Sequence, residues 1–109
     1  MIEIRNITNK EELDDFLSTD AEKTHLLKFG AEWCGPCRVL EQTLQSLDAE
    51  RVKDVLFGEV SIESDETEDL GVDYKIRNIP VLIAIVDGKE TGRTVGMQQA
   101  EQIYNLLGV

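Results

Sequence analysis

The sequence predicts an α/β fold in which helices flank both faces of a mixed central β-sheet, in the order β-α-β-α-β-α-β-β-α. Runs of large apolar residues alternate with runs whose apolar residues recur at helical spacing, a pattern typical of parallel strands joined by helices. Near the carboxyl end, Asp87-Gly88 separates two strand-like runs, as in a tight antiparallel hairpin. We therefore expect a single domain over residues 1–109 with a mostly parallel sheet.

The amino-terminal part of the chain supplies the first three expected strands, at about residues 2–7, 25–31 and 54–62. The first helix is expected to begin at Thr8, because Thr8 and Glu11 have the spacing of a capping box. Apolar residues three and four apart behind this cap would form the buried face of that helix.

The other expected elements follow from the same patterns. Leucines at helical spacing predict a second helix that ends at about Glu50. A short helix is expected within 67–75, and strands are expected at 81–86 and 91–95. The last helix is expected to stop at Gly108, because glycine is favoured just beyond a helix C-terminus.

Charge and composition exclude several classes of function. The protein has 109 residues, with 11 Lys+Arg against 22 Asp+Glu and a net charge of −11. This charge repels phosphate backbones and anionic lipid surfaces, so we expect neither a nucleic-acid nor a membrane partner. The sequence lacks a membrane-spanning apolar run and begins without the apolar core of a secretion signal, which predicts a cytoplasmic protein in a reducing compartment. The acidic stretch 63–73 is expected to be a solvated loop and short helix.

The only two cysteines, Cys34 and Cys37, directly follow the second expected strand, and chemistry in such sheets concentrates at the carboxyl ends of strands. At helical spacing i and i+3 their side chains share one face, within reach of disulfide geometry. The free N–H groups and dipole of a helix N-terminus stabilise an anion, so we expect Cys34 to form the attacking thiolate and Cys37 to be shielded. Pro36 fits a first helical turn and stiffens the bridge.

Three interpretations of this pair stay open. A redox pair fits a reducing compartment, where cysteines are seldom structural staples. A zinc half-site is the second interpretation, although structural zinc needs four ligands and the chain adds only His25, at the far end of the strand. The third is a pair of inert buried thiols.

Three features together resemble the thioredoxin family over essentially the whole chain. They are the string Trp33-Cys34-Gly35-Pro36-Cys37 after a strand, the Ile79-Pro80 step before another strand, and the Asp87-Gly88 hairpin with Gly96 beyond it. The resemblance implies a thioredoxin fold and a protein-disulfide reductase that cycles between dithiol and disulfide. It also implies disulfide-containing proteins as substrates, no bound metal or organic cofactor, regeneration by a thioredoxin reductase that uses NADPH, and a monomer.

The resemblance further implies a substrate groove beside the nucleophile. In the family the counterpart of Pro80 is cis and lines this groove. The residues that the resemblance assigns to it are Trp33, Gly35, Pro36, Ile62, Ile79, Pro80, Val95, Gly96 and Met97. A small residue is usual in the family at the position of Met97, so we expect a narrower or more adaptable groove here.

The sequence departs from the family most clearly at Lys28 and Glu59. The family carries a buried aspartate at the first position and a lysine at the second, so this chain has a charge-swapped pair. We expect the two side chains to pair, because an unpaired charge inside a covered sheet is costly; the alternative is that both point outward to solvent. The family's carboxylate accepts the proton of the second cysteine. We expect Glu59, or Lys28 in a partly neutral form, to act there through a water.

Two further departures concern packing. Gly30 replaces the family's aromatic residue and is expected to loosen the packing beneath the cysteines. Gln42 replaces a kinking proline, which predicts a less interrupted helix.

Two other functions stay open at this point. One keeps the chemistry and reverses its direction, which makes the protein an oxidant or isomerase. The other is a non-catalytic binding subunit of the same fold, whose charge of −11 favours a basic partner.

Overall fold

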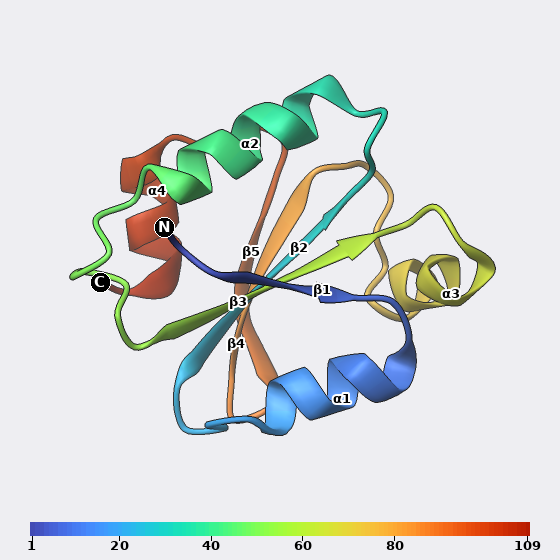
Figure 1. The fold of residues 1–109 in the computed structure, drawn as a ribbon, viewed down its shortest axis with the longest axis horizontal. Helices are drawn as coiled ribbons and strands as arrows, with labels where there is room; N and C mark the ends of the chain where they lie inside the picture. Colours follow the sequence, from blue (N-terminus) through green and yellow to red (C-terminus); the bar gives the residue numbers. More distant parts are fainter.

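Five strands form one mixed sheet in the computed structural model, which describes residues 1–109 (Figure 1). They are β1 (Ile4–Ile7), β2 (Thr24–Gly30), β3 (Val55–Ser61), β4 (Val81–Val86) and β5 (Lys89–Val95). Their order across the sheet is β1-β3-β2-β4-β5. The first three are mutually parallel, whereas β4 runs antiparallel to β2 and β5 antiparallel to β4. The expected element order and mixed sheet are therefore confirmed.

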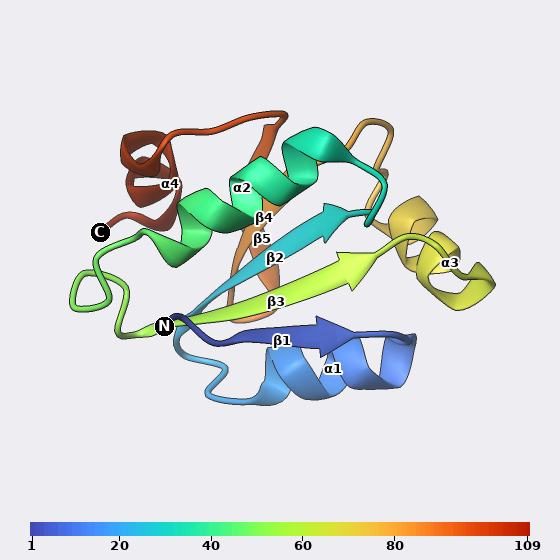
Figure 2. The same cartoon turned by 45° about the horizontal axis from the view of Figure 1, so that its top comes forward.

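Four helices cover the sheet: α1 (Lys10–Ser18), α2 (Gly35–Gln45), α3 (Asp65–Asp73) and α4 (Ala100–Leu107). Helices α2 and α4 lie over one face, and α1 and α3 lie over the other (Figures 1 and 2). Each pair of helices covers a separate hydrophobic core on its face of the sheet. No helix is both long and apolar enough to cross a membrane.

The two cores follow from side-chain alternation along β2. Leu26 packs in a first core cluster with Leu40 of α2 and Ile103 of α4. Leu27, which points to the opposite face, packs in a second core cluster with Phe16 of α1. A strand covered on both faces needs apolar residues at most positions, and β2 has them at Leu26, Leu27 and Phe29 but not at its first two residues or near its carboxyl end. That end is where the cysteines follow.

The β4–β5 hairpin has the predicted turn. Asp87 and Gly88 both adopt positive φ angles, 52° and 76°. Such angles are what a two-residue type I′ turn requires, because its twist matches that of the strands.

The start of α1 differs from the expectation by one residue. Asn9, not Thr8, is the N-cap, and its side chain accepts the backbone N–H of Glu12 at 2.9 Å. The carboxylate of Glu12 reaches back to the N–H of Thr8 at 2.7 Å. Asn9 therefore caps the helix in place of Thr8, and Glu12, rather than Glu11, binds the backbone N–H of Thr8.

Helix α2 ends at Gln45 rather than at about Glu50. Beyond it the backbone N–H of Asp48 donates to the hydroxyl of Tyr104 at 2.8 Å, and Glu50 N–H donates to the Asp48 carboxylate at 3.0 Å. These bonds replace helical ones. Leu47 is still buried, so its apolar character reflects packing after the helix has ended.

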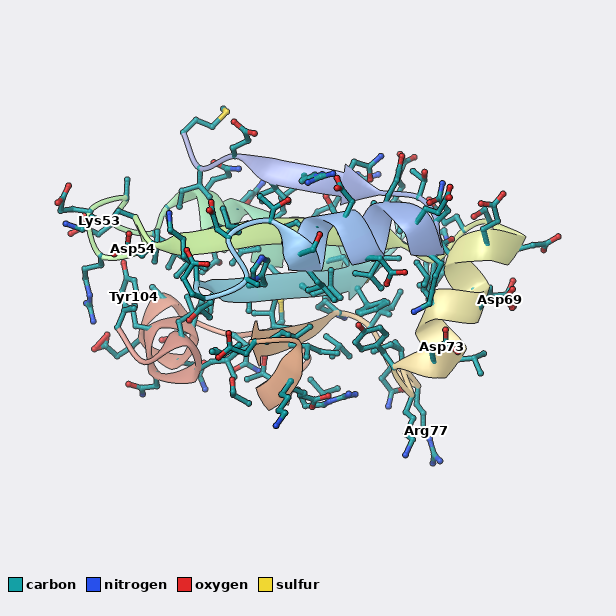
Figure 3. The ribbon with its side chains drawn as sticks, turned by 90° about the horizontal axis from the view of Figure 1, so that it is seen from below. Lys53, Asp54, Asp69, Asp73, Arg77 and Tyr104 are labelled. Carbon is teal, nitrogen blue, oxygen red and sulfur yellow. A yellow bond between two sulfur atoms is a disulfide. The ribbon has the colours of Figure 1, made fainter.

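Helix α3 begins earlier than the expected range 67–75. The Ser64 hydroxyl caps it by accepting the N–H of Thr67 at 3.2 Å, and the Thr67 hydroxyl accepts the N–H of Ser64 at 3.1 Å. Asp69 and Asp73 are exposed on this helix and point away from the sheet (Figure 3). The acidic stretch is a solvated helix, as predicted.

Candidate functional site

Cys34 and Cys37 form a disulfide where β2 gives way to α2, with their Cα atoms 5.3 Å apart. Cys34 is the N-cap of α2, and its Sγ accepts the backbone N–H of Cys37 at 3.2 Å. Pro36 stands in the first turn of the helix, where it has no hydrogen bond to lose. The sulfur of Cys34 thus lies at the positive end of the helix dipole, which stabilises an anion there.

The two cysteines are covered to different extents. Cys37 is 2% exposed and Cys34 is 6% exposed. Both pack with Ala31 in a small cluster at the carboxyl end of β2. Cys34 is therefore the slightly more exposed of the two residues.

The Ile79–Pro80 peptide bond is cis, as the family resemblance implied. Ile79 packs against the cysteine cluster, which brings the start of β4 beside the disulfide. The carbonyl of Pro80 accepts the N–H of Gly96 at 2.8 Å. This bond ties the end of β5 to the same site.

The structure leaves most of the expected groove residues open to solvent. Trp33 is 73% exposed, Val95 is 56% exposed and Met97 is 49% exposed. Gly35 and Pro36 are exposed as well. Exposed large apolar side chains beside a reactive group suit contact with another protein.

Ile62 is placed differently from the other expected groove residues. It packs against the second core cluster, and its Cγ2 lies 3.6 Å from where a Cβ on Gly71 would be. Its backbone N–H donates to the carbonyl of Gly30 at 2.9 Å. Ile62 thus lies on the α3 side of the site.

Lys28 and Glu59 form the predicted ion pair. They are register neighbours on β2 and β3, and Lys28 Nζ lies 3.0 Å from Glu59 Oε1. The Lys28 side chain is 3% exposed and that of Glu59 is 28% exposed. The alternative, in which both point outward to solvent, is wrong.

A pocket of about 270 Å³ joins this ion pair to Cys37. Sequence reasoning missed its other walls, which come from β1, the β2–α2 connection, the end of β3 and the first turns of α2. They are Asn6, Ala31, Glu32, Arg38, Glu41 and Ser61. No single motif groups them, because sheet order and helix placement bring them together.

Gly30 does not loosen the packing beneath the cysteines, contrary to the expectation. A Cβ there would lie 3.1 Å from Cys37 Sγ and 3.3 Å from Cys37 Cβ. The cysteine fills the space that a side chain would occupy. Helix α2 passes through Gln42 without a break, as predicted.

His25 lies at the opposite end of β2 from the cysteines. Its Nε2 faces the carbonyl of Thr19 at 2.8 Å and its Nδ1 faces that of Lys23 at 3.2 Å. The protein has no group of three or more potential metal ligands.

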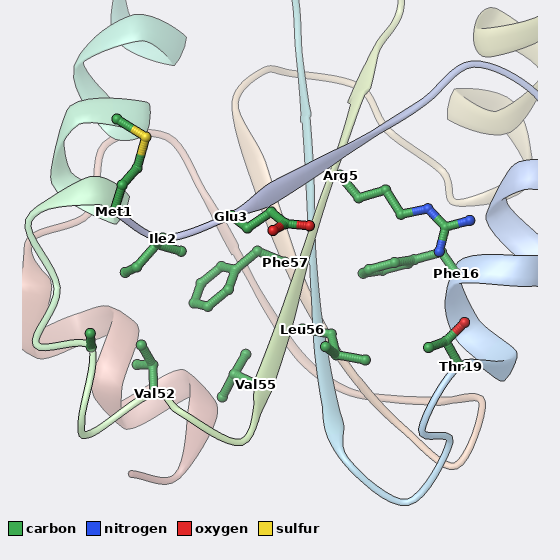
Figure 4. Close-up of a pocket in the computed structure, with 11 residues that line it drawn as sticks. Met1, Ile2, Glu3, Arg5, Phe16, Thr19, Val52, Val55, Leu56 and Phe57 are labelled. Atoms are coloured by element: carbon green, nitrogen blue, oxygen red, sulfur yellow. The ribbon is translucent and has the colours of Figure 1, made fainter.

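An apolar pocket of about 440 Å³ lies between the first residues of the chain, the α1 region and the start of β3 (Figure 4). Phe16, Val55 and Phe57 are among its lining residues, together with the first residues of the chain. Val55 pairs with Thr24 at the start of β2, whereas the cysteines follow the end of that strand. This pocket is separate from the redox site.

Comparisons with known proteins agree with this geometry. A family model described as Thioredoxin matches residues 5–108. The chain is similar to Thioredoxin of Mycoplasmoides gallisepticum, with 36% identity over 104 residues that cover 95% of this chain and 99% of the relative. It is 38% identical over 101 residues to Thioredoxin of Chlamydia caviae, which covers 93% of each. The solved structure of Fasciola hepatica thioredoxin matches with a TM-score of 0.82 and 25% identity, covering 94% of this chain and 96% of that one.

Proposed function

The chain belongs to the thioredoxin family, and on that premise we propose a role for each residue of its redox site. Members of this family reduce protein disulfides by dithiol exchange, and the Cys34–Cys37 pair makes this protein a thiol–disulfide oxidoreductase. The observation that carries the assignment is the disulfide at the N-terminus of α2. No bound cofactor is needed for this chemistry.

Cys34 is the attacking residue. Its thiolate attacks one sulfur of a substrate disulfide, forms a mixed disulfide and releases the other substrate sulfur as a thiolate. Cys37 then attacks Cys34 Sγ, which expels the second substrate sulfur and leaves the Cys34–Cys37 disulfide. The substrate gains two electrons and two protons. The position of Cys34 at the helix N-terminus and its greater exposure support this order.

The exposed residues around Cys34 bind the substrate. Pro80 and Ile79 support the segment that carries the disulfide, and an apolar rim flanks it. That rim consists of Trp33, Gly35, Pro36, Val95, Gly96 and Met97, with Ile62 extending it toward α3. Their exposure and the bond between Gly96 and Pro80 support this arrangement.

The Lys28–Glu59 pair serves the second step, in which Cys37 must lose a proton. Glu59 accepts this proton through water in the pocket that it lines together with Cys37 and Lys28. We expect Glu59→Gln and Lys28→Met to slow resolution of the mixed disulfide at neutral pH. Unchanged single-turnover rates in both variants would refute this role.

The proposed chemistry also suggests a physiological setting. The protein works as a monomeric single domain in the cytoplasm, where thiols are kept reduced. A separate thioredoxin reductase that draws on NADPH restores its dithiol. The bacterial relatives named Thioredoxin, which match almost the whole chain, support this setting.

Trapping the mixed disulfide tests the order of attack. Cys37→Ser should form a stable covalent complex with a disulfide-containing protein, visible on a non-reducing gel, because nothing resolves it. Cys34→Ser, the matched control, should form none. The reverse result would exchange the roles of the two cysteines.

The midpoint of a redox titration decides the direction of the reaction. A two-electron transition more reducing than the cytosolic glutathione pool supports a reductase. A more oxidising midpoint would favour the oxidant or isomerase, and no reversible transition would leave the binding subunit.

A further inference from the structure

Lys28 places a buried ammonium group on the same side of the sheet as Cys37. The Lys28 residue is 2% exposed. Its Cε lies 3.7 Å from the point where a Cβ on Gly30 would stand, and Cys37 Sγ lies 3.1 Å from that same point. Lys28 and the sulfur of Cys37 therefore both border the space left by the absent side chain of Gly30, and both residues line the same pocket.

Lys28 is the one charged group at this pocket that is withheld from water. Its partner Glu59 is partly exposed, and the other charged residues of the pocket wall, Glu32, Arg38 and Glu41, are exposed. Charges in water are strongly screened, whereas a buried charge acts through a medium of lower dielectric constant. Lys28 is thus the charge that acts most strongly on Cys37.

We propose that Lys28 is a positioning residue that holds the thiolate of Cys37 in the reduced protein, and that Glu59 limits the strength of this interaction. The inference rests on the proposed function, because it concerns the same exchange reaction. Lys28 neither gains nor loses a proton in it. The proton of Cys37 leaves to the pocket, the thiolate's electron pair forms the bond to Cys34 Sγ, and the expelled substrate sulfur takes up a proton.

This interaction should shift the redox potential of the cysteine pair in a direction that can be predicted. A group that stabilises the thiolate stabilises the dithiol state and makes the couple more oxidising. Removing the ammonium by Lys28→Met should therefore make the protein more reducing. Removing the opposing carboxylate by Glu59→Gln should make it more oxidising. A purely structural role for the ion pair would give no such opposite signs.

The test is a redox titration of the intact protein against defined dithiol/disulfide buffers, at neutral pH and at about pH 9, where more thiolate is present. We expect Lys28→Met to change the equilibrium constant about tenfold at the higher pH, equivalent to about 30 mV. Glu59→Gln should shift it in the other direction. The matched controls are Lys53→Met and Glu50→Gln, which change the same charges in an exposed pair far from the cysteines. These controls should leave the potential unchanged.

A second readout covers the case in which Lys28→Met fails to fold. In a Cys34→Ser background, absorbance of the Cys37 thiolate at about 240 nm can be followed against pH with Glu59 present or replaced by Gln. The thiolate should form at lower pH in the Glu59→Gln protein. Shifts in the same direction, no shifts, or equal shifts in the controls would overturn the inference. A wild-type protein without a reversible redox transition would instead refute the proposed function.

Discussion

Removing the carboxylate of Glu59 should cost more stability than removing the ammonium of Lys28, although the two groups are partners. The difference in cost follows from how deeply each side chain is buried. The Lys28 side chain is 3% exposed, so Glu59→Ala leaves a buried cation without its partner. The Glu59 side chain is 28% exposed, so Lys28→Met leaves a carboxylate that water can solvate.

The expected losses in the free energy of unfolding follow from the same difference in burial. Breaking a fully buried ion pair by removing one partner costs about 3–5 kcal/mol. Water in the adjoining pocket lowers this figure, so we expect about 2–3 kcal/mol for Glu59→Ala. Lys28→Met replaces the buried ammonium with an apolar chain of similar length and should cost about 1 kcal/mol or less.

Urea unfolding of the oxidised protein measures both costs. The wild type, the two single variants and Lys28→Met/Glu59→Ala form a double-mutant cycle, with a coupling energy of about 1–2 kcal/mol expected. The midpoints should move while the urea dependence stays constant. Equal costs for the two single variants, or a greater cost for Lys28→Met, would refute the argument from burial.

Three further predictions concern residues outside the site. Gly58→Ala should lower the free energy of unfolding by about 1–3 kcal/mol in a thermal or urea melt, since its Cβ would lie 2.9 Å from the Phe16 ring in the packed second cluster; an unchanged melt would contradict this. The hydrogen bond from Arg93 lowers the pKa of Glu90 below its ordinary value of 4.5. The wild type should therefore have a higher free energy of unfolding than Glu90→Gln at neutral pH, by less than about 1 kcal/mol. This difference should disappear as the pH falls below 4.5. Burial raises the pKa of Tyr74 above its ordinary value of 10.0, so this ring stabilises the fold below pH 10 and loses that contribution as pH rises further; Tyr74→Phe should remove the later phase of the absorbance titration at about 295 nm.

Local sequence signals predicted most of the fold; the starts of α1 and α3 were misplaced by a few residues, and the end of α2 was missed because a distant contact decides it. The Asp87-Gly88 turn depends only on its own two residues, and it was predicted correctly. The end of α2 depends on the hydroxyl of Tyr104, which is 56 positions from the Asp48 N–H that it binds. Leu47 continues the helical spacing for a packing reason, so periodicity alone extended the helix too far.

The redox site was predictable to the extent that strand register determines it. Lys28 and Glu59 lie opposite each other on neighbouring parallel strands, and the cost of burying one charge alone predicted their pairing. The environment of Gly30 was not predictable in this way. Its role depends on how closely α2 approaches β2, which strand alternation does not specify, and the result is contact with Cys37 rather than loose packing.

For the redox potential, which charge stands at position 28 matters more than the presence of an ion pair. Alternation places Lys28 and Gly30 on the same face of β2, beneath α2, so the charge at position 28 lines the same pocket as Cys37. Position 59 is nearer to solvent, so its charge is more strongly screened. An acid at position 28 paired with a base at position 59 would keep the same net charge and the same ion pair, yet it would set a negative charge beside the Cys37 thiolate. The double variant Lys28→Asp/Glu59→Lys should therefore be more reducing than the wild type, and an unchanged potential would show that the depth of the charge has no influence on the couple.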